Sequence, residues 1–195
     1  MAYVPKILAF AGSTRTDSFN KKLVKIAVAG ARAAGAEVTL IDLRDFPMPV
    51  YDGDLEVKEG IPPKAQQLKQ LMLANQGLLI SSPEYNSSIP GGLKNALDWA
   101  SRSAPGESPL ACFVGKVATL MSASPGGLGG LSGLVHLRAM LANIHVLVLS
   151  DQMAIARAHE AFNLDETLKE ARQQQAIEGL GRALAEMLMK LNRPT

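Results

Sequence analysis

The sequence predicts a doubly wound α/β fold, in which helices cover both faces of a parallel sheet. Five short apolar runs alternate with helical patterns along a chain of 195 residues that is 47% hydrophobic. The runs are continuously apolar rather than alternating, as in strands covered on both faces. Right-handed crossovers then give one parallel sheet. A chain of this length buries one core well, so we expect a single domain over residues 1–195.

The expected elements follow one another in a regular order. Strands are expected at Lys6–Ala11, 37–41, Gly77–Ser81, 116–121 and 145–150. Helical patterns occupy 20–35, 65–76, 91–103, 130–144 and 165–191. In the first of these, apolar residues recur every three or four positions and give one stripe to pack on a sheet. The longest irregular stretch, 46–63, is rich in Pro, Gly and acid, which favours a functional or interfacial role.

Composition excludes several classes of function. Lys and Arg exceed Asp and Glu by only 20 − 18 = 2, and no basic run is dense enough for a nucleic-acid binder. The single cysteine, Cys112, can form no internal disulfide, and no zinc-type spacing occurs, which favours the cytoplasm. No run approaches the ~20 apolar residues of a membrane span, and the N-terminal apolar run is too short for a secretory signal.

The loop after the first expected strand carries an unusual set of polar groups. Residues 11–20 read AGSTRTDSFN, and the positive end of the following helix favours an anion there. Arg15 adds a planar cationic fork, Asn20 an amide donor, and four residues offer hydroxyls: Ser13, Thr14, Thr16 and Ser18. We expect a phosphate monoester, since no Walker A ending is present. The alternative is an ordinary helix start capped by Asp17 or Ser18.

The loop after the third expected strand contains an aromatic ring among polar groups. It reads SSPEYNSSIPGGLKNALDWA over 81–100, and Pro90 can open the next helix. At the carboxyl edge of a sheet such a loop suits the edge and face of a planar ligand. The alternative makes Tyr85 a half-buried surface ring and Asn86 a turn former.

A glycine-rich loop follows the fourth expected strand. It reads SASPGGLGGLSG over 122–133, and its glycines allow close approach of the backbone to a flat ligand. Gly127-x-Gly129 before a helix also suggests a dinucleotide loop, with Asp151 as the acidic residue that binds a ribose. This match is weak, because Ser132 stands where the third Gly or Ala belongs.

Three segments together resemble the NADPH-dependent FMN reductase family, a flavodoxin-like group that includes bacterial quinone, chromate and azo-dye reductases. The segments are GSTRTDSFN, PEYNSSIPGGLKNALDW and SASPGG, and the resemblance runs from about residue 6 to residue 150. It implies a flavodoxin-like sheet of five parallel strands in the order 2-1-3-4-5. It also implies FMN as cofactor, NADPH or NADH as co-substrate, and a homodimer or homotetramer.

The resemblance also assigns cofactor-binding residues, motif by motif. The first loop would hold the FMN phosphate, the PEYN loop would lie along the ribityl chain and the isoalloxazine, and the glycine-rich loop would reach the other side of the flavin. The residues so assigned are Ser13, Arg15, Ser18, Asn20, Pro83, Glu84, Tyr85, Asn86, Ser122, Gly126 and Gly127. We expect no metal site.

The expected activity needs no catalytic side chain, because a flavin accepts hydride at its own ring. We therefore assign structural roles to the three histidines, His136, His145 and His159. The leading interpretation is an NAD(P)H oxidoreductase that passes electrons through FMN to quinones, chromate, azo compounds or free flavin. One alternative is a flavodoxin-like carrier that docks protein partners, although the near-neutral charge gives little steering. Another is a flavin-free dehydrogenase, which leaves the first two loops unexplained.

Trp99 provides the residue-based argument for association. It lies off the apolar stripe of the expected helix at 90–103. A large aromatic in that position is either tucked beneath a neighbouring loop or part of an exposed patch, and exposed patches mark interfaces. We therefore expect at least a homodimer, with the segment 51–56 near the partner chain.

Overall fold

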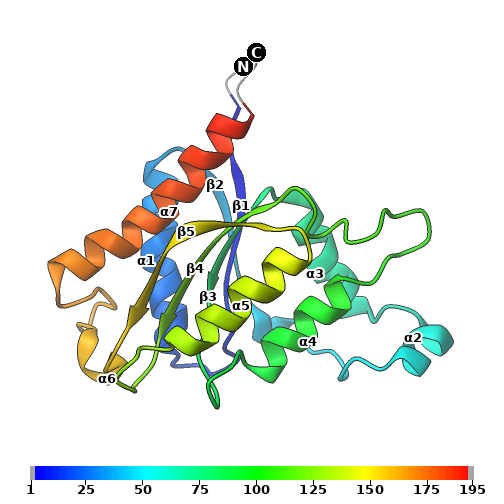
Figure 1. The fold of residues 1–195 in the computed structure, drawn as a ribbon, viewed down its shortest axis with the longest axis horizontal. Coiled ribbons are helices and arrows are strands. Elements are labelled where there is room, and N and C mark those ends of the chain that lie inside the picture. Colours follow the sequence, from blue (N-terminus) through cyan, green and yellow to red (C-terminus); the bar gives the residue numbers. More distant parts are fainter. Residues whose placement is uncertain (1–2, 193–195) are drawn as a thin grey trace.

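Five parallel strands form one sheet in the order β2-β1-β3-β4-β5 in the computed structural model, which describes residues 3–192 (Figure 1). The strands are β1 (Lys6–Ala11), β2 (Glu37–Asp42), β3 (Gly77–Ser81), β4 (Val117–Ala123) and β5 (Leu147–Ile155). The helices are α1 (Phe19–Ala33), α2 (Gly53–Glu59), α3 (Pro63–Ala74), α4 (Gly91–Ala100), α5 (Leu131–Asn143), α6 (Ala158–Ala161) and α7 (Ala171–Leu191), with a 3₁₀ turn at Leu43–Asp45. The predicted fold class and strand order are confirmed.

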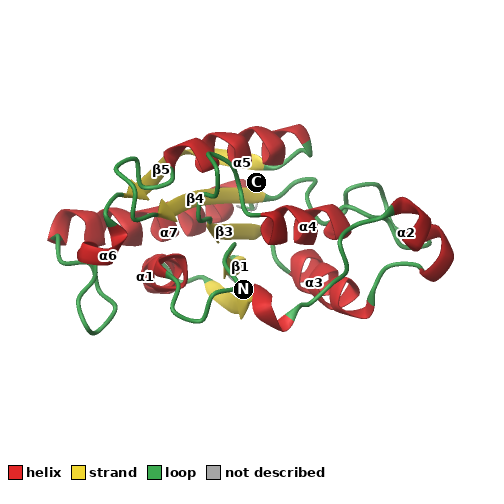
Figure 2. Cartoon of the chain, turned by 90° about the horizontal axis from the view of Figure 1, so that it is seen from below, coloured by secondary structure: helices red, strands yellow, loops and turns green. Residues whose placement is uncertain are grey.

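The sheet separates two groups of helices. Helices α1 and α7 pack on one face, and α3, α4 and α5 pack on the other (Figure 2). All residues of β3 and β4 are buried, as their continuously apolar runs require in a doubly covered sheet. Among the described residues, no helix combines the length and apolarity of a membrane span.

Helices α1 and α7 approach each other through two glycines. A Cβ on Gly30 would lie 2.0 Å from the carbonyl oxygen of Glu178, and a Cβ on Gly181 would lie 1.9 Å from that of Ala27. Both distances are impossible contacts, so only glycine allows the two backbones to come this close. The crossing fixes the first helix, which carries the polar loop of residues 12–18 at its amino end.

Several predicted boundaries are wrong, each for a local reason. The last strand runs to Ile155 instead of ending at residue 150, because it is an edge strand with a register shift opposite Thr119 that tolerates Asp151 and Gln152. The last helix begins at residue 171, because Asp165 accepts hydrogen bonds from the N–H and hydroxyl of Thr167 and holds a turn there. The expected helix at 91–103 ends at Ala100, because the hydroxyl of Ser101 donates to the carbonyl oxygen of Asp98 and caps the last turn.

The sequence predicts an irregular stretch at 46–63, but the structure shows that it contains α2. The carboxylate of Asp52 accepts hydrogen bonds from the N–H groups of Asp54 and Leu55, which begins the helix. None of its residues is buried. The signal for α2 is therefore a helix cap rather than an apolar stripe.

Candidate functional site

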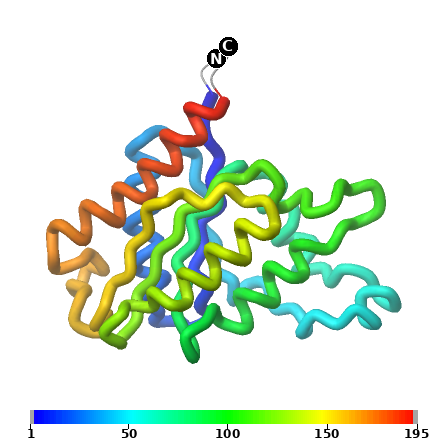
Figure 3. Tube along the Cα trace, in the orientation of Figure 1, coloured from blue at the N-terminus to red at the C-terminus, as the bar shows by residue number. Residues whose placement is uncertain are grey.

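The loops that follow β1, β3 and β4 meet at the carboxyl edge of the sheet, at the lower side of the trace in Figure 3. They border a hollow of about 60 Å³. It is lined by Ser13, Arg15, Ser18, Phe19, Asn20, Pro83, Glu84, Tyr85, Ala123, Ser124 and Pro125. Seven of the residues assigned from the sequence therefore lie around one cavity, where ligands of open parallel sheets bind.

The first loop presents hydroxyls beside the amino end of α1. Ser13 and Ser18 are 3% and 4% exposed, whereas Arg15 is exposed. Ser18 occupies the N-cap position, yet its side chain makes no capping hydrogen bond, so its hydroxyl is available to a ligand. The unpaired N–H groups of the first helical turn add donors and positive potential. This donor set suits a phosphate.

Arg44 holds the same loop from outside the hollow. Its Nε donates to the carbonyl oxygen of Thr14 at 2.8 Å, and its Nη1 donates to the hydroxyl of Thr16 at 2.7 Å. Two of the hydroxyl-bearing residues of the loop are thus fastened to the end of β2. Sequence reasoning missed Arg44, because it belongs to no local motif and its hydrogen-bond partners lie 30 and 28 positions away.

Asn20 joins three elements beneath the hollow. Its Nδ2 donates to the carbonyl oxygen of Ala123 at 2.8 Å, and its Oδ1 accepts from Ser81 Oγ at 2.8 Å and from the Ala123 N–H at 3.0 Å. The residue is 2% exposed. These bonds leave one N–H of the carboxamide for a ligand. Asn20 therefore ties the first loop to the ends of β3 and β4, besides lining the hollow.

The second loop is pinned to α5. The N–H of Gly133 donates to Oε2 of Glu84 at 2.8 Å, so this carboxylate occupies the amino end of α5. Tyr85 is 50% exposed beside the hollow, and its backbone pairs with that of Ser88. Asn86 forms the turn between them at a φ of 52° and is exposed and outside the cavity lining.

The third loop contributes different residues from those assigned. Ser124 and Pro125 line the hollow, whereas Gly126 and Gly127 are exposed and lie beyond it. Ser122 is fully buried, its hydroxyl has no hydrogen-bond partner, and a Cβ on Gly130 would lie only 2.0 Å from it. The segment SASPGG lies in a loop that borders the hollow, and the length of this loop decides which of its residues face the cavity.

The donor set fits FMN better than a nucleoside triphosphate or a diphosphate. The hollow offers one group of phosphate donors, from Ser13, Arg15 and Ser18, and an exposed aromatic ring, Tyr85, from another loop. A ligand with a terminal phosphate and a flat ring matches this set of groups.

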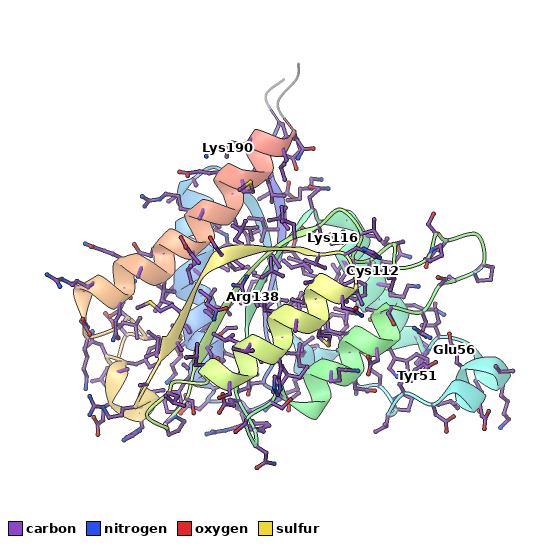
Figure 4. The ribbon with its side chains drawn as sticks, in the orientation of Figure 1. Tyr51, Glu56, Cys112, Lys116, Arg138 and Lys190 are labelled. Carbon is purple, nitrogen blue, oxygen red and sulfur yellow. The ribbon has the colours of Figure 1, made fainter. Side chains whose placement is uncertain are left out.

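The single cysteine and the three histidines do not line the hollow. Cys112 is 1% exposed, and burial raises the pKa of its thiol. Burial also lowers the pKa of nearby Lys116 (Figure 4). The ammonium of Lys116 donates to the carbonyl oxygen of Asn75. His136 contacts Ser88 Oγ, and His159 contacts Glu160. In residues 3–192, no group of three His, Cys, Asp or Glu side chains could hold a metal ion.

Trp99 is tucked beneath a neighbouring loop and is not part of an exposed patch. It is fully buried, its indole N–H donates to the carbonyl oxygen of Pro49 at 2.8 Å, and its ring meets Tyr51 edge-on at 5.0 Å. Tyr51 also donates to Oε2 of Glu56 (Figure 4), and its ring faces the guanidinium of Arg102. Trp99 therefore provides no apolar surface for an interface.

Comparisons with known proteins agree with this site. Residues 5–160 match the family described as NADPH-dependent FMN reductase. An NAD(P)H-dependent FMN reductase of Pseudomonas aeruginosa is 36% identical over 176 residues, which cover 87% of this chain and 90% of that protein. A quinone reductase of Escherichia coli is 34% identical over 145 residues, 74% of this chain and 73% of that protein.

A solved structure extends the similarity to the whole fold. FerB, a flavoenzyme NAD(P)H:(acceptor) oxidoreductase from Paracoccus denitrificans, has a TM-score of 0.80 to this chain at 28% identity. The alignment covers 96% of this chain and 98% of FerB. The likeness therefore reaches well beyond the three loops around the hollow.

Proposed function

The chain belongs to the NADPH-dependent FMN reductase family and is a flavin-dependent NAD(P)H oxidoreductase, and from this premise we propose that quinones are its main acceptors. Chromate, azo compounds and free flavin are further acceptors in this proposal. Relatives named quinone reductase support the choice. We further propose that the chain acts as one FMN-binding domain and that it works in the cytoplasm, since its single cysteine can form no internal disulfide.

The observation that carries the proposal is the hollow at the carboxyl edge of the sheet. Ser13, Arg15 and Ser18 converge there from one loop, and Tyr85 borders it from another. In the proposed arrangement the two serine hydroxyls, the guanidinium and the first N–H groups of α1 bind the FMN phosphate. Asn20 lies beneath them and positions the loop.

The other assigned residues surround the rest of the cofactor in this proposal. Pro83, Glu84, Tyr85 and Asn86 lie along the ribityl chain and one side of the ring, and the loop containing Ser122, Gly126 and Gly127 lies on the other. When bound, FMN supplies the redox chemistry, since its ring accepts hydride from a nicotinamide and passes electrons on. The protein's part is to bind and orient, and Tyr85 shields one side of the ring site from water.

Cofactor identity and electron acceptance test the proposal together. The purified protein should be yellow, mass spectrometry of the extracted cofactor should give FMN, and anaerobic NADPH should bleach the colour. A panel of a benzoquinone, chromate, an azo dye and free FMN then ranks the acceptors by kcat/KM. A yellow protein that NADPH does not bleach, or a quinone that ranks below any other acceptor of the panel, would contradict the proposal.

We also propose that the chain associates at least as a homodimer, with the segment 51–56 near the partner. Apolar side chains that the chain leaves exposed around the site support association, since such patches mark interfaces. They include Leu128, Leu131 and Val135, which are 67%, 43% and 55% exposed. Light scattering at micromolar concentration should give at least twice the 20.7 kDa mass of one chain, and a flavin-loaded, active single chain would refute the homodimer.

A further inference from the structure

A second hollow of about 410 Å³ adjoins the proposed flavin site. It lies between the first turn of α1 and the segment that contains α6 and the turn before α7, at the lower left of Figure 1. Phe19 lines both hollows, so a molecule that extends from one can reach the other. Its volume falls in the range of small-molecule sites.

The walls of this hollow combine cations with aromatic rings. Lys22 and Lys169 both line it, and none of its lining residues is acidic. The rings of Phe19 and Phe162 stack at its border, with centroids 5.9 Å apart and planes 9° apart. The hollow between β5 and α7, in contrast, is lined by Asp151 and Glu186 as well as a lysine. Cations beside aromatic faces suit a ligand that carries both phosphate and a base.

The two lysines differ in how they are engaged. The ammonium of Lys22 lies 2.7 Å from a carboxylate oxygen of Asp17, whose side chain is 77% exposed at the rim. Lys169 is exposed and forms no ion pair with any residue in 3–192. Lys169 is therefore free to bind an anion. Lys22 is paired with an exposed carboxylate, and a phosphate would compete with that carboxylate for the ammonium.

We propose that this hollow binds the adenosine end of the nicotinamide co-substrate, and that Lys22 and Lys169 bind the 2′-phosphate that distinguishes NADPH from NADH. The inference rests on the proposed function. A dinucleotide carries its nicotinamide and its adenosine phosphate at opposite ends, so its adenosine end can lie in this hollow while its nicotinamide reaches over the FMN bound in the first. Phe162 offers the adenine an aromatic border.

Titration of fragments tests the hollow directly on the FMN-loaded protein. Calorimetry with adenosine 2′,5′-bisphosphate and with AMP should show tighter binding of the bisphosphate. Lys169→Gln should lower the affinity for the bisphosphate about fivefold, the size of a partly exposed ion pair, and leave that for AMP unchanged. Phe162→Leu should weaken both fragments alike. Lys190→Gln, near the far end of α7 (Figure 4), is the matched control and should change neither.

Asp17→Asn gives a test of opposite sign. It removes a carboxylate from the rim and releases Lys22, so the affinity for the bisphosphate should rise, whereas Lys22→Gln should lower it as Lys169→Gln does. Equal binding of bisphosphate and AMP by the unaltered protein, or an unchanged affinity in both lysine variants, would overturn the proposal.

Steady-state kinetics separates this proposal from the proposed function. The ratio of kcat/KM for NADPH to that for NADH should fall about fivefold in Lys169→Gln, with FMN content and kcat with NADH unchanged. A ratio that stays the same refutes the role of the lysine while the oxidoreductase activity stands. If neither NADPH nor NADH bleaches the yellow protein, the proposed function fails. The fragment titration still decides whether the hollow binds a 2′-phosphate.

Discussion

Replacing Ser81 by Ala should weaken cofactor binding although Ser81 does not line the hollow. Its hydroxyl donates to Oδ1 of Asn20 at 2.8 Å in a fully buried position. Ser81→Ala removes one hydrogen bond and leaves Oδ1 bonded to the N–H of Ala123, so no buried group loses its last partner. We expect a loss of about 1 kcal/mol in the free energy of unfolding.

Asn20→Ala should lower the free energy of unfolding more than Ser81→Ala does. It leaves the N–H and the carbonyl oxygen of Ala123 without the partners that Asn20 supplies, together with the hydroxyl of Ser81. A buried group left without a partner costs roughly 1–3 kcal/mol, so we expect a loss of about 3 kcal/mol. Urea unfolding of the apoprotein measures both variants on the same scale.

Two ligands then separate positioning from direct contact. If Asn20 mainly holds the loops together, Ser81→Ala should lower the affinities for FMN and riboflavin by the same factor, up to about tenfold for 1.4 kcal/mol. If the carboxamide of Asn20 instead binds the phosphate directly, Asn20→Ala should lower the affinity for FMN but not for riboflavin. Ser81→Ala should then change neither affinity. That second pattern would refute the positioning role of Asn20.

Three further predictions concern the phosphate, the core and acid stability. Arg15→Ala should lower FMN affinity about ten- to hundredfold with unchanged unfolding, measured by flavin titration. Gly181→Ala should cost about 1–3 kcal/mol in urea unfolding, because its Cβ would meet the carbonyl oxygen of Ala27. Glu107→Gln should destabilise by about 1–2 kcal/mol, because it removes the counter-charge of Lys69, which is 3% exposed. The hydrogen bond from Lys69 lowers the pKa of Glu107 below 4.5, so this stabilisation is present above pH 4.5. The free energies of unfolding of the unaltered protein and of Glu107→Gln should therefore converge as the pH falls through the lowered pKa.

The sheet and the place of the site could be predicted because both depend on local patterns. The continuously apolar runs of β1, β3 and β4 each end in a polar loop, and parallel strands bring such ends to one edge. Ser13, Arg15 and Tyr85 consequently line one hollow, as the loop chemistry indicated.

The partners of these residues could not be predicted, because they are distant in sequence. The bond from Asn20 to Ala123 spans 103 positions, and the bond from Arg44 to Thr14 spans 30. An amide donor in a first turn suits a phosphate as well as a neighbouring strand, and only tertiary structure distinguishes the two uses. Similarly, the length of the third loop, which no motif encodes, places Ser124 rather than Gly126 at the hollow.

The burial of Trp99 changes which surface of the chain can mediate association. Its indole fixes Pro49, and Tyr51 packs on its ring, so the segment before α2 is anchored to α4. Beyond this anchor α2 has no buried residue, and Val57 is 89% exposed. A helix of seven residues is too short to be stable alone in water, yet the anchor and the cap at Asp52 hold it out from the body (Figure 1). Apolar surface that a partner chain could cover is therefore found on α2 and at the start of α5, and not on the side of α4 that carries Trp99.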